Sequence, residues 1–379
     1  MFPHGSAITT ISSEEDLIDL EPEWQQLLAV SDGSTPFQTW EWIWSWWKHH
    51  GQGRMYLLVA RREGALVGLL PLFISRFRGL PLRQIRFMGA PLSDLQNLIS
   101  SREDRDSCGR AFFAHIAADA HLWDFCDLAD LLEQSSLREQ AQLAGLSLEQ
   151  RFHRLCPSIC LAPTWSSYTS SLGKKMRSKA GYYRRRLRRE LGAVFDMVHG
   201  AEVPEAMTEL FRLHNTRWKA RGASGALSDS RTQKFHLEVA RRFDEKGWLR
   251  LCRLRAQGRT VAMLYGFHFG RRSYNYLSGF DVELAKYSPG QALLSYSIEQ
   301  AISETANEYD LLRGAESYKY DWNAVDRRTE RLIVGRSGIR SRVGRRLHAL
   351  EYYLEHRGLR LQRWLWDGAG ARGRVSDRE

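Results

Sequence analysis

The chain of 379 residues has little cysteine, and the five cysteines are an odd, scattered set. They are Cys108, Cys126, Cys156, Cys160 and Cys252. Cys156 and Cys160 are close in sequence, but no second pair of cysteines or histidines completes a zinc-binding pattern. The cysteine content therefore argues against a disulfide-stapled fold and predicts no metal site. It is typical of a reduced, cytoplasmic protein.

Long apolar runs are also missing. The longest lies around Ala65 to Phe73, well short of the roughly 20 residues that span a bilayer as a helix. The N-terminal residues Met1 to Gly5 show no basic region followed by an apolar core, so we expect no signal peptide. We predict a cytoplasmic protein, with a peripheral position at the inner face of the membrane left open.

What the chain does contain is typical of a globular protein with more than one domain. Hydrophobic residues make up 43% and charged residues 26% of the sequence. The length exceeds that of one ordinary hydrophobic core, so two domains are expected. The net charge of +11 favours an acidic partner without choosing one. Nucleic acid, anionic lipid, a nucleotide cofactor and acidic glycans all remain open.

One α/β pattern occurs twice along the chain. Periodicity predicts helices over residues 13–30 and 40–49, followed by strands over 55–60 and 65–75. Helices over 203–221 and 229–246 then precede strands over 248–254, 260–269 and 273–279. The two hairpins match at a spacing of 194 residues, through Arg61, Gly64, Val67 and Gly68 in the first and Arg255, Gly258, Val261 and Ala262 in the second. We interpret the chain as two copies of one α/β unit.

Only the second copy carries an anion-binding turn. Residues 287–294 read Y-S-P-G-Q-A-L-L, which predicts a turn leading into a helix over 291–305 and a strand over 309–312. Bare N–H groups and the helix dipole make such a helix start suitable for phosphate or pyrophosphate. Pro289 fixes the backbone, and Gly290 lets a ligand approach without a Cβ in the way. The candidate anion-binding residues are Ser288, Pro289, Gly290, Gln291 and Ala292.

A basic segment over residues 174–189 is predicted to be helical. Met176, Ala180, Tyr183 and Leu187 recur at helical spacing and would form its buried face. The cations could be a solvated surface, a track for nucleic acid, a contact for an anionic membrane or a contact for a phosphate-bearing cofactor. These alternatives stay open on the sequence alone.

Two aromatic or apolar segments have simpler interpretations. Trp40, Trp42, Trp44, Trp46 and Trp47 spread around one helix, so most are expected in the core or between the lobes, with one or two left for an acceptor groove. Residues 343–366 predict a basic amphipathic helix that either packs on the second lobe or rests on a membrane. The motif G-x-G-x-x-G at residues 368–373 follows no strand, so it is assigned to a flexible tail.

The region from Trp248 to Trp322, with S-P-G at 288–290 and L-R-G-A-E-S-Y-K-Y at 312–320, resembles the CelD-like branch of the GNAT acyltransferase superfamily, which is related in architecture to FemAB-type transferases. The resemblance extends over about residues 20–330. It implies an α/β fold of two tandem GNAT-like lobes, each a mixed, mostly antiparallel sheet flanked by helices. The expected parts are an N-terminal lobe over 1–165, a basic linker helix over 166–195, a C-terminal lobe with the acyl-CoA site over 196–335, and a basic amphipathic helix with a flexible tail over 336–379.

The same resemblance implies an acyl-CoA-dependent N-acyltransferase. Acetyl-CoA, or another acyl-CoA, would place its pyrophosphate on residues 288–292, and the acyl group would pass directly to an amine of a cell-envelope or polysaccharide-related acceptor. Direct transfer needs a base, oxyanion donors and an acid. The expected catalytic residues are Glu316, Tyr318 and Asp281, and the expected substrate-binding residues are Arg313, Lys319 and Trp322. Asp310 is also a base candidate, although pairing with a nearby arginine is favoured for it.

Two other functions remain in competition. A FemAB-like transferase would take an aminoacyl group from charged tRNA and use the basic helix as an RNA contact. A non-catalytic binding module in polysaccharide biosynthesis would keep a degenerate cofactor turn. The expected partners are a small-molecule or glycan amine acceptor, with an anionic membrane surface or the polysaccharide-synthesis machinery as further candidates and nucleic acid as the less favoured one.

Overall fold

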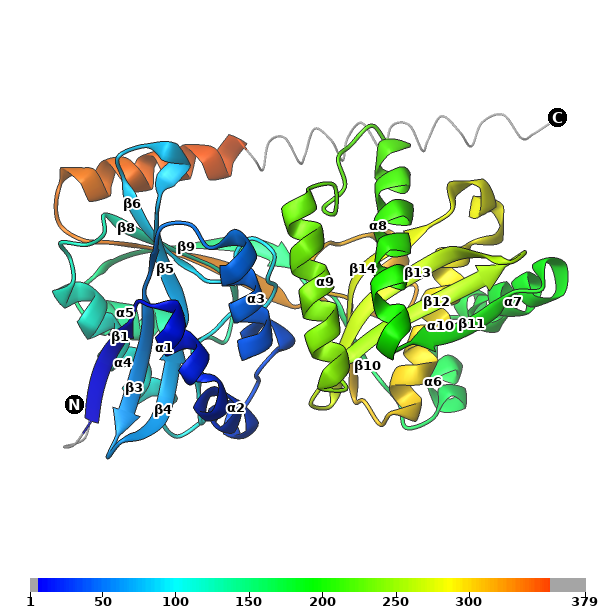
Figure 1. Ribbon diagram of the computed structural model, residues 1–379, viewed down its shortest axis with the longest axis horizontal. Coiled ribbons are helices and arrows are strands. Elements are labelled where there is room, and N and C mark those ends of the chain that lie inside the picture. The colour runs from blue at the N-terminus through cyan, green and yellow to red at the C-terminus, as the bar shows by residue number, and fades with distance from the viewer. Residues whose placement is uncertain (1–5, 355–379) are drawn as a thin grey trace.

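The computed structural model describes residues 6–354, which form two lobes side by side (Figure 1). The helices of the N-terminal lobe are α1 (Glu14–Asp19), α2 (Glu21–Val30), α3 (Trp40–His50), α4 (Arg105–Ala118) and α5 (Leu137–Leu143). Its strands are β1 (Ser6–Ile11), β2 (Arg54–Met55), β3 (Leu57–Arg62), β4 (Ala65–Leu70), β5 (Leu72–Arg76), β6 (Arg83–Phe87), β7 (Ile99–Ser100), β8 (Phe125–Leu132) and β9 (Ser147–Leu155).

The helices of the C-terminal lobe are α6 (Trp165–Ser171), α7 (Lys174–Leu191), α8 (Val203–Lys219), α9 (Ser230–Glu245), α10 (Pro289–Ser303) and α11 (Ser317–Tyr320). Its strands are β10 (Ser158–Cys160), β11 (Val194–Val198), β12 (Leu249–Ala256), β13 (Arg259–Phe269), β14 (Arg272–Phe280) and β15 (Glu308–Asp310). The last described strand, β16 (Arg328–Gly335), precedes a helix over residues 339–354.

The strands form mixed, mostly antiparallel sheets. The C-terminal lobe holds one sheet in the order β10-β15-β14-β13-β12-β11, in which only β14 and β15 run parallel. The N-terminal lobe holds a sheet β1-β3-β4-β7 and a sheet β2-β5-β6-β8-β16-β9, in which β6 and β8 run parallel. Helices flank these sheets in both lobes (Figure 1). The predicted fold class, two α/β lobes with mixed sheets, is confirmed.

The first lobe differs from the prediction in having two sheets. The pattern over residues 65–75 predicts one strand, but the strand is interrupted at Pro71, between β4 and β5. Proline has no N–H to donate to a ladder, so it separates two pairings. β4 pairs with β3, whereas β5 pairs with β6.

The internal repeat is visible in the backbone. The hairpins β3–β4 and β12–β13 both turn through two residues with positive φ, 50° and 84° at Glu63 and Gly64, and 51° and 74° at Gln257 and Gly258. Each hairpin also has a register shift, between Ala60 and Arg61 in the first and at the equivalent place in the second. The shared turn and shared bulge agree with the prediction that the two hairpins are copies of one unit.

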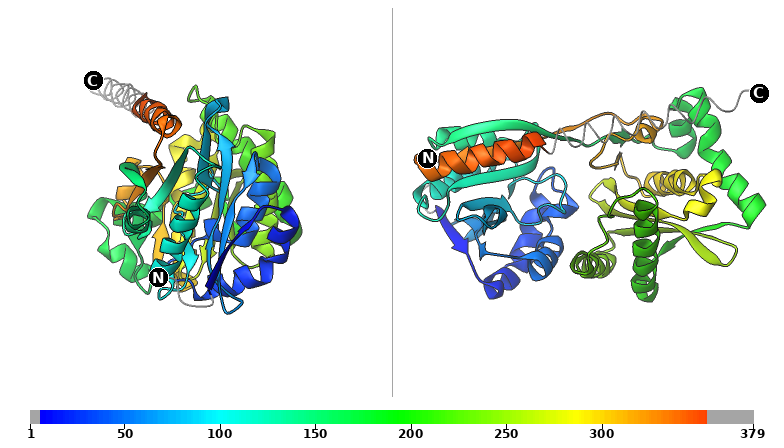
Figure 2. Two further views of the ribbon diagram at one scale, coloured as in Figure 1. Left: turned by 90° about the vertical axis from the view of Figure 1, so that its left-hand side faces the viewer. Right: turned by 90° about the horizontal axis from the view of Figure 1, so that it is seen from above.

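The chain crosses between the lobes twice. β10 pairs with β15 in the C-terminal sheet, and β16 returns to lie between β8 and β9 in the N-terminal lobe. The predicted C-terminal lobe over residues 196–335 includes β16. The pairing of β16 with β8 and β9 places it in the N-terminal lobe instead. The helix over 339–354 then packs on the N-terminal lobe (Figure 2), so its predicted packing on the second lobe is wrong. The rest of the predicted tail, including residues 368–373, lies outside the described residues.

A continuous hydrophobic core joins the lobes. Trp42 of α3 is fully buried, and its ring centroid lies 5.0 Å from that of Phe235 on α9 and 5.9 Å from that of Phe267 on β13. The indole N–H of Trp42 donates to the Ser93 hydroxyl at 2.8 Å. Trp40 and Trp46 are also buried. The prediction that most tryptophans of this helix serve core and inter-lobe packing is confirmed.

Candidate active site

The central strand β14 separates from its neighbour β15 part-way along its length. The two strands pair from Arg272 to Tyr274 only, opposite Glu308 to Asp310. β14 continues to Phe280 while remaining paired with β13 on its other side. The register against β13 shifts so that Tyr276 becomes an extra, bulged residue. The second half of β14 therefore has no strand partner on the side of β15.

The helix α10 begins beside the end of β14, where Gly290 lies close to the Phe280 ring. Ser288 precedes it with a left-handed backbone (φ 53°), and Pro289 occupies its first turn. The N–H of Ala292 donates to the Ser288 carbonyl at 3.1 Å, whereas those of Gly290 and Gln291 have no acceptor among the described residues. The predicted turn and helix start are present. Two N–H groups with the positive end of the helix dipole form an anion-binding arrangement.

Arg217 of α8 is a candidate that the sequence reasoning missed. The Phe280 ring lies between Arg217 and the turn. A Cβ added at Gly290 would lie 3.3 Å from this ring, and the Arg217 guanidinium lies 4.5 Å from its centroid. Arg217 has no carboxylate partner among the described residues, and its Nε is buried without an acceptor. Burial, with Arg221 nearby, lowers its pKa. The signal was available: Leu210, Leu213 and Arg217 share one apolar helical face.

The basic helix α7 supports the turn from the other side. Met176, Ala180 and Leu187 are buried, and Tyr183 is partly buried, which confirms the predicted packing face. The Arg186 guanidinium lies 4.6 Å from the centroid of the Tyr287 ring and donates to the Lys286 carbonyl at 3.1 Å.

Glu316 lies in the loop after β15, and Tyr318 lies in the short helix α11 that follows. Burial, together with the nearby Glu316 carboxylate, raises the pKa of Tyr318 to about 12, so its hydroxyl keeps its proton at neutral pH. Arg217 is close enough to both residues to interact electrostatically with them. The Glu316 carboxylate is half exposed and lies 3.0 Å from the Lys319 ammonium. The structure therefore brings Glu316, Tyr318 and Arg217 together.

Lys319, Arg313 and Trp322 are occupied by contacts within the protein. Lys319 is buried and donates to the carbonyls of residues 311, 312, 313 and 314 at 2.9–3.1 Å. Arg313 pairs with Asp94 of the N-terminal lobe. Trp322 is fully buried and donates to the Gln291 side chain at 3.1 Å. These contacts favour structural roles that shape the site, because the charged or N–H group of each side chain already has a partner inside the protein.

Asp281 and Asp310 are likewise engaged. Asp281 accepts from the N–H of Glu283 at 3.0 Å and pairs with Arg259. Asp310 pairs with Arg327 and accepts from the N–H of Leu312 at 2.8 Å. Burial raises the pKa of Asp310 to about 6. Pairing with an arginine was the favoured interpretation of Asp310, and it is confirmed.

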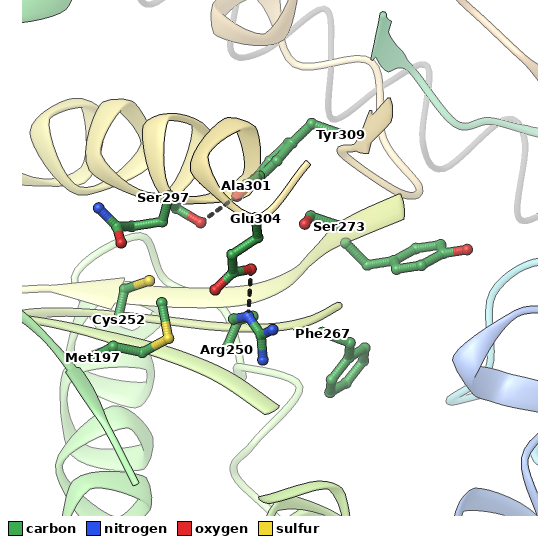
Figure 3. Close-up of a pocket in the computed structure, with 11 residues that line it drawn as sticks. Met197, Arg250, Cys252, Phe267, Ser273, Ser297, Ala301, Glu304 and Tyr309 are labelled. Carbon is green, nitrogen blue, oxygen red and sulfur yellow. Dashed lines mark hydrogen bonds and ion pairs between the residues drawn. The ribbon is translucent and has the colours of Figure 1, made fainter. Parts of the chain in front are cut away.

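An internal cavity lies beneath the second half of α10, away from its N-terminus (Figure 3). It is lined in part by Cys252, Ser297 and Tyr309, whose hydroxyl meets that of Ser297 at 2.7 Å, and by the ion pair between Arg250 and Glu304. Its volume of about 10 Å³ suits one water molecule. It is too small for an organic ligand.

Over residues 6–354, no group of three or more histidine, cysteine, aspartate or glutamate side chains is arranged to hold a metal ion. No helix in the same range combines the length and the apolar content needed to cross a bilayer.

Comparison with known proteins agrees with this geometry. Residues 174–320 match the family described as the acetyltransferase (GNAT) domain. This segment, about two fifths of the chain, is similar to the GNAT domain of acetyltransferases. It contains the basic helix α7, the strands β14 and β15, and the start of α10. An acyltransferase is the class of enzyme that such a domain supports. A search of curated proteins gives no match.

Similar folds occur among solved structures. The structure of FemX has a TM-score of 0.62 at 10% identity, over 86% of this chain and 96% of that one. A conserved protein of unknown function from Bacteroides thetaiotaomicron has a TM-score of 0.56 at 12% identity, over 86% and 100%. L-PGS from Bacillus licheniformis has a TM-score of 0.54 at 10% identity, over 84% and 91%. At these identities the likeness establishes a shared fold.

Proposed function

We propose that the protein is an acyl-CoA-dependent N-acyltransferase, with acetyl-CoA as the favoured donor and an amine of a cell-envelope or polysaccharide-related molecule as the acceptor. One observation carries the proposal: the N–H groups of Gly290 and Gln291, which have no acceptor among the described residues, lie beside the end of β14, in the segment that matches the GNAT domain. The CelD-like assignment of the branch rests on the resemblance of residues 248–322 and belongs to the same proposal.

The residues around the turn fit a pyrophosphate. The two N–H groups would bind its oxygens, and the guanidinium of Arg217, which has no acidic partner among the described residues, would supply charge. Gly290 leaves room at the point where a side chain would fill the space beside Phe280. An acyl-CoA bound there would supply the activated acyl group, with its pyrophosphate held by the start of α10 and by Arg217.

The N-terminal lobe lacks this arrangement. In that lobe the helix α4, which lies between β7 and β8 in the sequence, begins after Asp104. The Asp104 carboxylate pairs with Arg62 and lies where an incoming anion would be repelled. This contrast supports a single cofactor site, in the C-terminal lobe.

Two side chains are suited to move protons. Tyr318 keeps its proton at neutral pH because burial raises its pKa to about 12, so it can donate to the departing sulfur. The half-exposed Glu316 carboxylate can accept the proton of the incoming ammonium. We keep Asp281 as a weaker candidate because it is buried as well as paired with Arg259, whereas the Glu316 carboxylate stays half exposed beside Lys319.

Two observations favour a second candidate function. The fold likeness to FemX extends over 96% of that chain, and the basic helix α7 lies against the candidate site. A transferase that takes an aminoacyl group from charged tRNA would use α7 as its RNA contact, and its binding would weaken steeply with salt.

A comparison of thermal unfolding with acetyl-CoA, with longer acyl-CoAs and with tRNA tests the proposal. A ligand at about 100 times its dissociation constant adds roughly 2.7 kcal/mol to stability. We expect an acyl-CoA to raise the melting temperature. Stabilisation by tRNA alone would support the second candidate, and stabilisation by none would favour a non-catalytic binding module.

A further inference from the structure

The helix over residues 339–354 is amphipathic, but its polar face packs against the protein and its apolar face is exposed. Its inner face, against the N-terminal lobe, is polar: Ser341 is 1% exposed and His348 is 2% exposed. The Ser341 hydroxyl accepts from the N–H of Arg336 at 3.1 Å, and the His348 Nε2 lies 3.6 Å from a carboxylate oxygen of Asp127. The core-facing side of this helix is therefore occupied by polar contacts.

The outer face of the same helix is apolar and exposed. Its members recur every three or four residues and so form one ridge: Ile339 (72% exposed), Val343 (43%), Leu347 (36%), Leu350 (55%) and Leu354 (59%). We call these five residues the outer ridge. Among the other described elements, no helix or strand carries more than one exposed large apolar side chain. Such a concentration on a protein surface marks an interaction site.

Several contacts hold the outer ridge in a fixed orientation. Arg340, near the start of the helix, bonds to Asp124 at 3.2 Å, and Glu351 near its end pairs with Arg78. Between them, Gly344 packs closely against the Phe125 ring, so that a Cβ there would lie 2.7 Å from it. The helix lies across the outside of the N-terminal lobe with its far side uncovered by other described elements (Figure 2).

The charges beside the outer ridge indicate the chemical class of the partner that it would bind. Arg342 and Arg346 are exposed on one edge of the ridge and form no ion pair with any described carboxylate. Glu351 is the one acid within residues 339–354, and Arg78 occupies it. An apolar ridge rimmed by unpaired arginines matches the interface of an anionic bilayer, in which acyl chains meet phosphate head groups.

A second copy of the chain fits less well. Pairing two such ridges in an antiparallel way would bring the Arg342 and Arg346 edge of one helix against the same edge of the other. No free carboxylate on this helix could compensate that repulsion.

We propose that the outer ridge docks the protein on the surface of an anionic lipid bilayer. The helix would lie in the plane of the interface, with its roughly 24 Å length parallel to the membrane and the ridge turned toward the acyl chains. This surface belongs to the N-terminal lobe, whereas the candidate acyl-CoA site belongs to the C-terminal lobe. Membrane docking can therefore be tested independently of the proposed enzymatic function.

The test is co-sedimentation of the full chain with vesicles. We expect binding to vesicles of phosphatidylcholine mixed with phosphatidylglycerol, little binding to pure phosphatidylcholine, and weakening as salt is added. Leu350→Glu should reduce the affinity at least about tenfold, because a charge would enter the apolar interface. Arg342→Gln with Arg346→Gln should weaken binding to the anionic vesicles while leaving the ridge intact.

Leu143→Glu serves as the matched control, since Leu143 is 69% exposed on α5, outside the helix. It should bind like the unaltered chain, and thermal unfolding should show that all variants remain folded. Equal binding of Leu350→Glu and the unaltered chain would overturn the proposal. A dimer that Leu350→Glu converts to a monomer, without vesicle binding by either, would also overturn it.

Discussion

Arg313, in the loop after β15, pairs with Asp94 in a loop of the N-terminal lobe, where Asp94 is 3% and Arg313 29% exposed. The same guanidinium donates to the carbonyls of Pro91 and Ser93 at 3.1 Å. Close by, the hydroxyl of the bulged Tyr276 donates to the Leu92 carbonyl at 2.7 Å. The N-terminal lobe is thus fastened to the two strands that border the candidate site.

Arg313→Ala should lower the free energy of unfolding by about 3 kcal/mol, because it leaves the Asp94 carboxylate buried without its partner. Replacing both residues by leucine should recover much of that loss. Urea denaturation measures both values. Arg241→Ala, which removes an exposed pair with Glu245, is the control and should change stability by less than about 1 kcal/mol. A loss no larger than the control would contradict the buried role of the pair.

His236 should make the protein less stable in acid. Burial lowers its pKa to about 3, so the folded state holds it neutral. The unfolded chain binds the proton below a pKa of about 6.5, so this contribution is complete above that pH and is lost as the pH falls toward 3. At pH 5 the loss is about 2 kcal/mol. Urea denaturation at pH 7 and pH 5 should show a correspondingly smaller pH effect in His236→Phe than in the unaltered chain.

Because other buried groups titrate in the same range, the comparison between the two proteins is what matters. Asp310, for example, takes up its proton near pH 6 and acts in the opposite direction. An identical pH dependence in both proteins would contradict the burial of a neutral His236.

Arg217→Ala should weaken acetyl-CoA binding by roughly 10- to 100-fold, the range expected for a lost charge-assisted contact to phosphate. Arg217→Lys should lose less. Arg212→Ala lies on the same helix but removes an arginine that is half exposed and paired with Glu209, so its affinity should stay unchanged. Isothermal titration would measure all three, and equal affinities for Arg217→Ala and Arg212→Ala would remove Arg217 from the site.

Because the two hairpins have similar turns, replacing the glycine in either turn should cause a similar loss of stability. Gly64 and Gly258 have φ of 84° and 74°, and a Cβ at either would meet nothing within 4 Å. Gly64→Ala and Gly258→Ala should each therefore lower stability through the backbone alone, by about 1 kcal/mol. Urea denaturation of the two variants gives the comparison. Costs that differ several-fold would mean that the two turns are not equivalent.

Local patterns predicted the elements well, and long-range contacts explain what they missed. The hairpin repeat, the buried face of α7 and the packing of Trp42 follow from periodicity, which is a local property. The placement of β16 between β8 and β9 joins segments about 200 residues apart, and nothing within its own sequence specifies those partners.

In the candidate site, too, local features could be predicted from the sequence and features set by long-range contacts could not. The turn at Ser288 to Ala292 has its own local signature, so the sequence predicted it. Lys319 looked like a ligand-binding cation, but it is needed to satisfy four carbonyls of a tight loop. Arg217 was overlooked because its importance depends on Phe280 and Gly290, which are distant in sequence.

The most direct test of the central claim is isothermal titration of acetyl-CoA into the unaltered chain and into Gly290→Trp. A Trp side chain at this position would fill the space beside Phe280 and cover the two free N–H groups. We expect measurable binding to the unaltered chain and its loss in Gly290→Trp, with the thermal unfolding of the two ligand-free proteins similar. Unchanged binding of acetyl-CoA by folded Gly290→Trp would contradict the placement of the acyl-CoA site at the start of α10.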